Sequence, residues 1–570
     1  MIRYVVFAVL ALGIAVVAYL LTDKNDYASD EETLVKGKNL FTKNCMSCHS
    51  LEGDGIGPPL GGVTNILSRK DLTTFIKNPA QVIEAKGKRA VSLLARYKQV
   101  MPPFEGMQDP DIHAILSYIH HQTEVHNLQA VLLSDTTKGG LTGRLVQPIK
   151  QSPIKIELEQ IVQIPRKKDA SPDLGIVTLR AHPSGDGSLF VGDQNGTIYS
   201  VRDGKHEIFL DIRAHVKDFQ SGPGIATGVG SFDFHPDFLN NGLIYITHAE
   251  TYKGQRADYT ISDSLKSVVQ WVISEWKMDN VNDKVFRGTH REMLRLHAPN
   301  FAHGCQEIAF IPGLDTKDPN YGLLYIGYGD GGSNNIKHPE LGHHLKSFLG
   351  TVMRIDPAGN NSRNGNYGIP ADNPFVHETD PAIVKEIYAL GFRNPHRLSW
   401  DPTNSNRMMV TDIGEANVEE LNIVEKGGDY GWPNREGTFG ISTLKDMKKV
   451  YPLGKSDRDL YKKPFVQYDH EEGNAIDGGH VYEGELMPLK NKYVFGDIVN
   501  GKLFYINIDP HLSDSTIYAL AIVKDGKATT LQEMFNTKRL HQRIAYDPFK
   551  KDLYVITKAD GKIWRVSKAY

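Results

Sequence analysis

The chain has 570 residues, of which 40% are hydrophobic and 23% are charged, and its mean hydropathy is -0.36. These values are typical of a folded globular protein and exclude a disordered, fibrous or polytopic membrane chain. The 65 basic and 68 acidic residues give a formal net charge of -3. The basic surplus that nucleic-acid binding requires is therefore missing, and we expect no nucleic-acid partner. Three cysteines are too few for a disulfide framework.

The N-terminal segment, residues 1–25, is predicted to be a membrane anchor. Residues 4–21 form an uncharged apolar run that, as a helix, just reaches the length needed to cross a bilayer. No Ala-x-Ala site follows it, so an uncleaved anchor is favoured over a cleavable signal peptide or a buried core helix. Arg3 favours a cytoplasmic N-terminus. We therefore expect a single-pass protein of the inner membrane with its domains in the periplasm.

Residues 45–49 have the sequence CMSCH. Cys45 and Cys48 have the spacing that joins two haem vinyl groups through thioethers, and the adjacent His49 is placed to ligate the iron. A CxxC pair also occurs in redox dithiols and zinc sites, but His49 and the absence of a second cysteine pair argue against both. With the turn DGIGPPLGG after the motif and MPPF at 101–104, residues 32–125 resemble an all-α class I cytochrome c domain.

The resemblance also implies the second axial ligand of haem c. In class I cytochromes the histidine is paired with a methionine that commonly precedes a proline, which points to Met101 before Pro102. Met107 is the nearest rival. Three histidines on or beside the terminal helix are weaker alternatives: His113, His120 and His121. The core face of that helix is predicted from apolar residues at helical spacing: Ile112, Ile115, Leu116 and Ile119. With both axial positions filled, the domain should carry electrons one at a time.

Residues 126–171 are polar and turn-rich and are expected to form a linker, within which the alternating segment 154–162 suits an edge or closing strand. Beyond it, a pair of apolar alternations with a Gly or Asx turn recurs, with copies that begin near residues 188, 243, 323, 407, 492 and 552. Their irregular spacing suits four-stranded blades with long inserted loops. We predict an all-β six-bladed propeller over residues 172–570, in preference to a β-sandwich, which rarely needs roughly 400 residues.

Seven segments of this body are specific enough to indicate a family. They are SFDFHPDFLNNGLIYI at 231–246, GDGGSNN at 329–335, LGTVMRIDP at 349–357, YGIPADNPF at 367–375, EIYALGFRNPHRLSWDP at 386–402, IGEANVEELNIVEKGGDYGWP at 413–433 and GGHVYEGE at 478–485. Together they resemble the glucose/sorbosone dehydrogenase family, the soluble aldose sugar dehydrogenases that depend on pyrroloquinoline quinone (PQQ). The resemblance implies a six-bladed propeller that binds PQQ and calcium at the mouth of its central channel.

The family resemblance implies a catalytic group of four residues. His303 matches the histidine that removes the proton from the anomeric hydroxyl of the sugar while hydride moves to the quinone, and Asp330 matches the aspartate that aligns it. The pairing is chemically sensible because a carboxylate partner makes a neutral imidazole a better base. Arg393 and Asn394 match the pair that contacts the quinone side of the cofactor. An arginine there stabilises the negative charge of the reduced quinone.

The resemblance also implies metal sites. Gly414 and Glu415 match the positions whose backbone carbonyls hold the PQQ-bound calcium, an oxygen-only arrangement that suits this hard cation. Glu420 and Tyr430 fall where the family holds a second, structural calcium.

The chain departs from the family at the positions that hold the three PQQ carboxylates. Arg539 matches one cationic residue, but His541 replaces a second arginine, Val499 stands where a lysine is expected, and Ala226 replaces a polar residue. Such losses weaken the binding of a polyanion unless other cations compensate. Three neighbouring residues are candidates for that compensation: Lys502, Lys538 and Arg543. Cys305 is interpreted as a small core residue or as a modifier of the site.

Two hypotheses follow for the function. The first is a membrane-anchored quinohaemoprotein that oxidises an aldose-type sugar or related alcohol with PQQ and passes electrons to its own haem c. A downstream acceptor, such as a component of the respiratory chain, would then reoxidise the haem. The alternative is a binding propeller that has lost PQQ and is tethered to an electron-transfer cytochrome.

Overall fold

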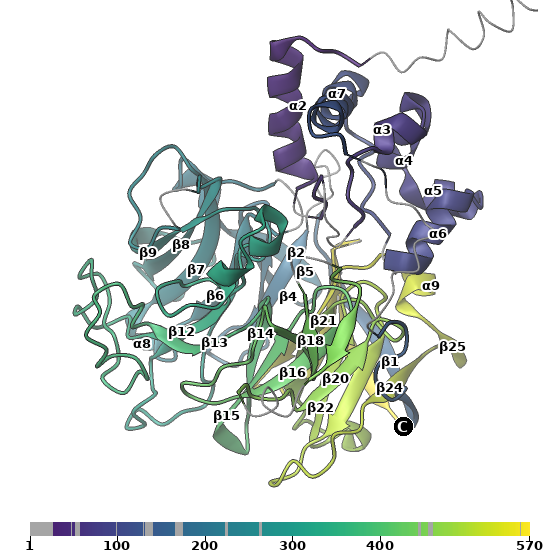
Figure 1. The fold of residues 1–570 in the computed structure, drawn as a ribbon. Helices are drawn as coiled ribbons and strands as arrows, with labels where there is room; N and C mark the ends of the chain where they lie inside the picture. The colour runs from purple at the N-terminus through teal and green to yellow at the C-terminus, as the bar shows by residue number, and fades with distance from the viewer. Residues whose placement is uncertain are drawn as a thin grey trace, which may run out of the picture.

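The computed structural model describes residues 27–46, 48–51, 57–97, 100–128, 130, 141–165, 175–222, 226–261, 265–442, 446–453, 460–537, 539–558 and 560–570. A helical domain is followed by a larger body of sheets arranged around a central axis (Figure 1). The predicted anchor, residues 4–21, lies outside these ranges. Within them, no helix combines the length and the apolar character needed to cross a membrane.

The N-terminal domain is all-helical, as expected for residues 32–125. Its helices are α2 (Glu31–Asn44), α3 (Val63–Ile66), α4 (Arg69–Lys77), α5 (Pro79–Glu84), α6 (Lys88–Tyr97) and α7 (Asp109–Val125). Asp30 caps α2 by accepting a hydrogen bond from Thr33 N at 2.8 Å, and Ser68 caps α4 in the same way. The predicted core face of α7 is confirmed, because all four apolar residues are at most 2% exposed and pack with Phe41 of α2.

Four separate sheets of the larger body each contain four antiparallel strands. The first two are β2 (Ile176–Ala181), β3 (Leu189–Asp193), β4 (Thr197–Arg202) and β5 (Lys205–Asp211), and β6 (Val229–Phe234), β7 (Leu243–Thr251), β8 (Val269–Met278) and β9 (Gly288–Ala298). The next two are β10 (Cys305–Phe310), β11 (Leu324–Tyr328), β12 (Thr351–Ile355) and β13 (Ile387–Leu390), and β14 (Pro395–Asp401), β15 (Asn404–Asp412), β16 (Val418–Val424) and β20 (Val466–Asp469).

A nine-stranded sheet completes the body, together with a small three-stranded one. The large sheet contains β1 (Lys150–Gln163), β21 (Ile476–Val481), β22 (Lys492–Asp497), β23 (Leu503–Asn507), β24 (Tyr518–Lys524), β25 (Lys527–Thr529), β26 (Gln542–Asp547), β27 (Asp552–Thr557) and β28 (Lys562–Ala569). The small sheet contains β17 (Arg435–Glu436), β18 (Phe439–Ile441) and β19 (Val450–Pro452). Short helices α8 (Phe238–Asn241) and α9 (Leu531–Phe535) and the 3-10 turns Ile212–Ala214, Ser333–Ile336, Pro339–Gly342 and Met487–Leu489 lie in the connections.

Six strands, one from each four-stranded sheet and two from the nine-stranded sheet, pack side by side in a closed ring. In order around the ring they are β2, β6, β10, β14, β21 and β26, and β26 again contacts β2. Apolar residues of adjacent sheets fill the space between them, as Trp271 of β8 and Tyr328 of β11 do in one shared cluster. This radial arrangement of antiparallel sheets is propeller-like.

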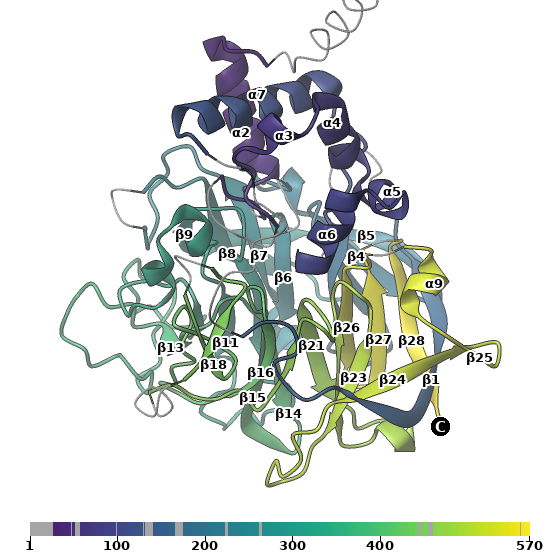
Figure 2. The same cartoon turned by 45° about the vertical axis from the view of Figure 1, so that its right-hand side comes forward.

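The strand β1 ties the start of the body to its end. It pairs antiparallel with β28, with Glu159 opposite Arg565, and parallel with β24, with Ile156 opposite Ile522. Ile156 is fully buried. The segment 154–162, predicted as an edge or closing strand within the linker, is therefore part of a closing strand. The helical domain lies over one end of the body in both views (Figures 1 and 2).

Candidate functional site

A cavity of about 680 Å³ lies in the helical domain at the CMSCH motif. Cys45, Cys48, His49 and Met101 all line it, and most of the other lining side chains are apolar. This volume lies within the range of cofactor pockets. The structure therefore brings the four predicted haem residues to one cavity whose size and polarity fit a haem.

The contacts of His49 suit iron ligation. Its Nδ1 lies 2.8 Å from the carbonyl oxygen of Pro58, and because a carbonyl only accepts, Nδ1–H is the donor and Nε2 keeps its lone pair. Burial lowers the pKa of His49, which favours the neutral ring that binds a metal. A backbone carbonyl that fixes the tautomer in this way is a common second contact of metal-ligating histidines.

Both methionine candidates line the cavity. Met107 also packs against the apolar core around α7, whereas Met101 lies in the segment between α6 and α7 beside Pro102. Among the described residues, the lining includes none of the three alternative histidines: His113, His120 and His121. Met101 therefore remains the first candidate and Met107 its rival.

His303 lies in the loop between β9 and β10 with a left-handed backbone, at a φ of 48°. Its Nδ1 is 2.7 Å from Oδ1 of Asp330. An ionised carboxylate only accepts, so Nδ1–H donates and Nε2 is the atom available to take a proton. A Cβ atom at Gly329 would lie 2.6 Å from the Cβ of His303, so this close approach of the two loops requires glycine there.

The carboxylate of Asp330 is buried and accepts further hydrogen bonds. Besides His303, its donors are Gly332 N at 2.9 Å, Trp432 Nε1 at 3.1 Å and Ser333 Oγ at 3.3 Å. Burial alone raises the pKa of Asp330, but His303 and Arg393 outweigh it and hold the pKa below its usual value. Asp330 is therefore ionised at neutral pH and fixes the orientation of His303.

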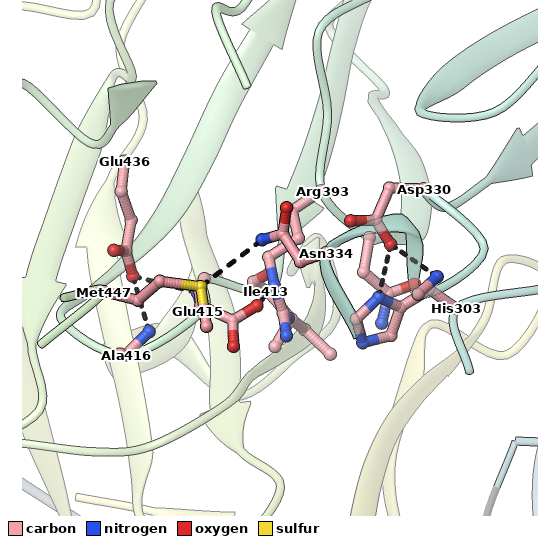
Figure 3. Close-up of polar contacts among 12 residues, drawn as sticks. His303, Asp330, Asn334, Arg393, Ile413, Glu415, Ala416, Glu436 and Met447 are labelled. Carbon is pink, nitrogen blue, oxygen red and sulfur yellow. Dashed lines mark hydrogen bonds and ion pairs between the residues drawn. The ribbon is translucent and has the colours of Figure 1, made fainter. Parts of the chain in front are cut away.

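Arg393 and Asn394 lie between β13 and β14, where their backbone N–H groups donate to the carboxylate of Asp412 at 3.0 and 2.6 Å. The Arg393 Nε donates to Glu415 Oε2 at 2.8 Å, and the guanidinium lies 5.8 Å from the ring centroid of Trp432. Burial lowers the pKa of Arg393, but Glu415 and then Asp330 outweigh it, so the pKa is raised. Figure 3 shows Arg393 between Glu415 and the paired side chains of Asp330 and His303.

The four predicted catalytic residues therefore lie together. The backbone N–H of Asp330 donates to the carbonyl oxygen of Arg393 at 2.7 Å, which joins the two loops directly. One fixed cation, one buried carboxylate and one imidazole with a free nitrogen form an arrangement that can take a proton and stabilise negative charge.

The loop that contains Gly414 and Glu415 is held by a single carboxylate oxygen, Oε1 of Glu436. Four consecutive backbone N–H groups donate to it: Glu415 at 2.9 Å, Ala416 at 2.9 Å, Asn417 at 2.8 Å and Val418 at 3.1 Å. In the described part of the chain, the buried Oε1 of Glu415 has no hydrogen-bond partner. Fixed carbonyl groups and a spare carboxylate oxygen are donors that suit calcium. The described residues hold no group of three or more His, Cys, Asp or Glu placed to bind a metal.

Glu420 and Tyr430 are engaged with separate partners. The Glu420 carboxylate accepts from Gly437 N and, at 3.1 Å, from Asn422 Nδ2. The Tyr430 hydroxyl donates to the carbonyl oxygen of Ile423 at 2.8 Å. Burial and neighbouring carboxylates raise the pKa of Glu420 to about 7. Their shared calcium stays a prediction.

The departures from the family remove charge on the carboxylate-binding side. Val499 is buried in a small apolar cluster with Ala475 and Ile498. Burial and the adjacent Arg539 lower the pKa of His541 well below its usual value, so this imidazole is neutral. Neither position supplies a cation.

Two of the three candidate compensating cations fall within the described residues. Lys502 is 47% exposed, and its Nζ donates to the carbonyl oxygen of Glu472 at the rim. Arg543 is buried on β26, where burial lowers its pKa to about 10 against the opposing effect of Asp477. Lys538 lies outside the described residues. Only Arg543 is therefore placed as a buried cation.

The structure adds a buried basic side chain that sequence reasoning missed, Lys558, directly after β27. It is 3% exposed, and its Nζ lies 2.6 Å from Oε1 of Gln194. Burial and the nearby Arg543 and Arg397 lower its pKa well below the usual value. Basic groups that are buried near one another gain most when an anion binds beside them, which makes Lys558 and Arg543 candidates to hold a polyanion.

Among the described residues, side chains of the larger body that contact the helical domain include Asn335, Arg539 and Lys448. Asn335 Nδ2 donates to Met46 O at 3.2 Å, Arg539 Nη1 donates to Val100 O at 2.6 Å, and Lys448 Nζ lies 3.9 Å from the ring centroid of Tyr97. Met46 is inside the haem-attachment motif, and Asn335 is on the loop that also bears Asp330. The two candidate sites therefore face one another.

Comparison with known proteins agrees with this geometry. The family model described as Glucose / Sorbosone dehydrogenase matches residues 178–565, and the model described as Cytochrome c matches residues 34–123. The chain belongs to the glucose/sorbosone dehydrogenase family. The resemblance stated from its motifs is thus confirmed, and the N-terminal part is a cytochrome c domain.

The relatives match part of this chain. HIPL1 protein of Arabidopsis thaliana is 26% identical over 371 residues, covering 56% of this chain and 50% of that protein. Quinoprotein glucose dehydrogenase B of Acinetobacter calcoaceticus is 28% identical over 322 residues, covering 53% of this chain and 59% of that protein. This chain thus spans about half the length of these relatives. The apo-form soluble aldose sugar dehydrogenase of Escherichia coli shares the fold, with a TM-score of 0.52 at 18% identity, over 73% of this chain and 99% of that one.

Three further site residues were not assigned from the sequence. Trp432 contacts both Asp330 and Arg393, Glu436 holds the loop of Gly414, and Lys558 lies on the carboxylate-binding side. Trp432 lies within a quoted family segment, which was the available signal. Cys305, left open between two interpretations, is buried in the core, and burial raises the pKa of its thiol to about 12. It is therefore a small core residue.

We predict that Met101→Leu abolishes the low-spin spectrum of the oxidised haem, because a leucine offers no sulfur to the iron. The measurement is the visible absorption spectrum of the purified full chain. Met107→Leu is the matched control and should retain the low-spin spectrum. The reverse pattern would assign the sixth position to Met107.

Proposed function

We propose that this chain is a quinohaemoprotein that oxidises an aldose-type sugar or a related alcohol with PQQ and passes the electrons to its own haem c. The observation that carries the proposal is the contact between Asn335 Nδ2 and Met46 O, at 3.2 Å. This contact joins the loop of the expected catalytic aspartate, Asp330, to the haem-attachment motif. Electrons that leave the propeller site therefore have the haem as their nearest covalently attached acceptor.

In this proposal the sheets form a six-bladed propeller. The nine-stranded sheet divides into two blades, β21–β24 and β26–β28 with β1, which are joined where β1 pairs parallel with β24. With the four separate four-stranded sheets this division makes six blades, one for each strand in the closed inner ring. The catalytic group then lies in the loops at one end of the channel.

The proposed roles follow from the contacts. His303 accepts the proton of a substrate hydroxyl at Nε2, because Nδ1 is committed to Asp330. Asp330 stays ionised and stabilises the imidazolium that results. Arg393 holds a fixed positive charge for the negative charge that develops on the electron acceptor, and the adjacent Asn394 contacts the same acceptor.

When bound, PQQ supplies a two-electron acceptor, calcium polarises it, and haem c accepts electrons one at a time. Arg543 and Lys558 would hold the PQQ carboxylates, and the carbonyls of Gly414 and Glu415 would hold the calcium. Two successive one-electron transfers are needed for each substrate. The covalent tether between the domains raises the effective concentration of the haem for both of them.

Loss of Lys558 tests the carboxylate-binding side. We expect Lys558→Met to weaken PQQ binding about tenfold or more, since a charge-assisted hydrogen bond contributes about 1.5–3 kcal/mol. Binding is measured by titrating PQQ into the calcium-loaded protein and following protein fluorescence. The control, Lys502→Met, removes an exposed rim lysine and should change the affinity less than twofold. Equal effects of the two variants would contradict the assignment.

Loss of His303 tests the chemistry. General-base loss typically costs about a hundred- to ten-thousandfold in rate, so His303→Ala should nearly eliminate sugar-driven haem reduction while PQQ binding stays within about twofold. The rate is followed as absorbance of the reduced haem after an aldose is added to protein loaded with PQQ and calcium. Two results would contradict the proposal: the wild-type chain binds no PQQ, or His303→Ala reduces haem at the wild-type rate. Either result would favour the alternative, a binding propeller that has lost PQQ and is tethered to an electron-transfer cytochrome.

We also propose that residues 4–21 anchor the chain in the inner membrane, with both domains in the periplasm, where a respiratory-chain component reoxidises the haem. The cytochrome c domain supports this side of the membrane, because haem is attached to c-type proteins outside the cytoplasm. Cell fractionation should find the full chain in the inner membrane and a variant that starts near Asp30 in the soluble fraction. A mature N-terminus near residue 23 would refute the anchor.

A further inference from the structure

The haem cavity of the cytochrome c domain has one wall residue that belongs to the propeller. All its lining residues lie between Asn44 and Ile119 except Arg539, which is in the loop between α9 and β26. In the described part of the chain, Arg539 and Arg89 of α6 are the two arginine or lysine side chains of the lining, and Asp71 is its one acidic side chain. Half of the cationic lining therefore comes from the other domain.

Two hydrogen bonds orient the Arg539 guanidinium. Nη1 donates to the carbonyl oxygen of Val100 at 2.6 Å, and Nε donates to Nε2 of His541 at 3.0 Å. His541 accepts this bond because its ring is neutral. Val100 directly precedes Met101, so Arg539 also steadies the segment that carries the expected axial ligand.

The positive charge of Arg539 is not matched by a carboxylate. Within the described residues its hydrogen bonds go to a carbonyl and an imidazole, and it forms no ion pair with an Asp or Glu side chain. Burial lowers the pKa of Arg539, and the effects of Cys48 and Asp497 that oppose this shift are smaller.

Haem c brings two propionate carboxylates to a cavity whose lining is mostly apolar, and a carboxylate that leaves water needs a cation or several donors. We propose that Arg539 binds a haem propionate, so that a propeller side chain completes the haem site of the cytochrome c domain. A planar guanidinium offers paired N–H donors that match a carboxylate. The inference rests on haem attachment at Cys45 and Cys48, and it holds whether or not PQQ binds.

This assignment differs from the one that the family resemblance implies. The resemblance places Arg539 on a PQQ carboxylate, but its guanidinium donates to the cytochrome c domain and lines the haem cavity. Burial lowers the pKa of His396, and Arg397, Arg543, Lys558 and His303 lower it further, so the buried Arg543 and Lys558 share a neighbour with His303. Arg543 and Lys558 are therefore the candidates that bind the PQQ carboxylates, and Arg539 is the candidate that binds a haem propionate.

A positive charge beside a haem favours its reduced form, because the reduced iron carries one positive charge fewer. Arg539→Gln should therefore lower the ratio of reduced to oxidised haem about tenfold at a fixed ambient potential, which is a midpoint about 59 mV more negative for a one-electron couple. The midpoint is measured by spectroelectrochemical titration of the purified full chain with neither sugar nor PQQ present.

Lys448→Gln is the matched control. Lys448 is another cation at the domain contact, where it lies over Tyr97, but it does not line the cavity. Its loss should change the reduced-to-oxidised ratio less than twofold. A wild-type midpoint in Arg539→Gln would overturn the inference, and so would an equal shift in Lys448→Gln, which would trace the effect to weaker docking.

Arg539→Lys keeps the positive charge. It therefore tests the inference even if the Arg539→Gln protein does not fold. A lysine cannot form the paired contact of a guanidinium, so the propionate bending band in the resonance Raman spectrum of the haem should shift. An unchanged band would overturn the inference. Because no measurement here uses substrate, a chain that passes these tests but never reduces haem with sugar would refute the proposed function and leave this inference standing.

Discussion

The buried carboxylate of Asp330 is the group on which the organisation of the propeller site depends. Its oxygens accept hydrogen bonds from His303, Trp432, Gly332 and Ser333, and its backbone N–H bonds to Arg393. These partners come from loops after β9, β11, β13 and β16, so the site forms only when three neighbouring sheets pack together. A hydrogen bond to a charged group contributes about 1.5–3 kcal/mol. Loss of this carboxylate would leave several buried donors unpaired at once, including the indole of Trp432.

The two sides of the site differ in how their charges are balanced. On the reacting side each charge has a partner within the protein, Arg393 with Glu415 and His303 with Asp330. Such groups keep their geometry before any ligand arrives, which is the preorganisation that stabilises developing charge. On the other side the basic side chains of Arg543 and Lys558 are both buried, and burial followed by the nearby Arg543 lowers the pKa of Lys558. This side gains free energy when an anion binds, so a polyanionic cofactor should also stabilise the folded propeller by mass action.

The parts of the site that the sequence predicted are those encoded within a few residues or within a family motif. The spacing of Cys45, Cys48 and His49 is a covalent requirement of haem attachment, and the core face of α7 follows from helical periodicity. The pairing of His303 with Asp330 came from the resemblance, and the structure brings the two side chains to 2.7 Å. Lys558 could not be predicted, because its neighbours Gln194, Arg397 and Arg543 lie on three other strands or loops that only the closed ring brings together. The role of Glu436 could not be predicted for a similar reason. Its carboxylate accepts hydrogen bonds from backbone N–H groups, and such groups leave no residue pattern in the sequence.

The contact between the domains matters for orientation more than for affinity. A covalent connection already keeps the cytochrome c domain at a high effective concentration, so a few polar contacts are enough to select one docked arrangement. Asn335 and Arg539 select it at two separate points, one at the attachment motif and the other beside the segment of Met101. Asn335 and Arg539 both donate to backbone carbonyls of the cytochrome c domain. These contacts therefore fix the position of its main chain and do not depend on which side chains it carries there. The same two residues belong to propeller loops that lead to the catalytic group and to the carboxylate-binding side. Any shift of these loops on cofactor binding would therefore be transmitted directly to the wall of the haem cavity.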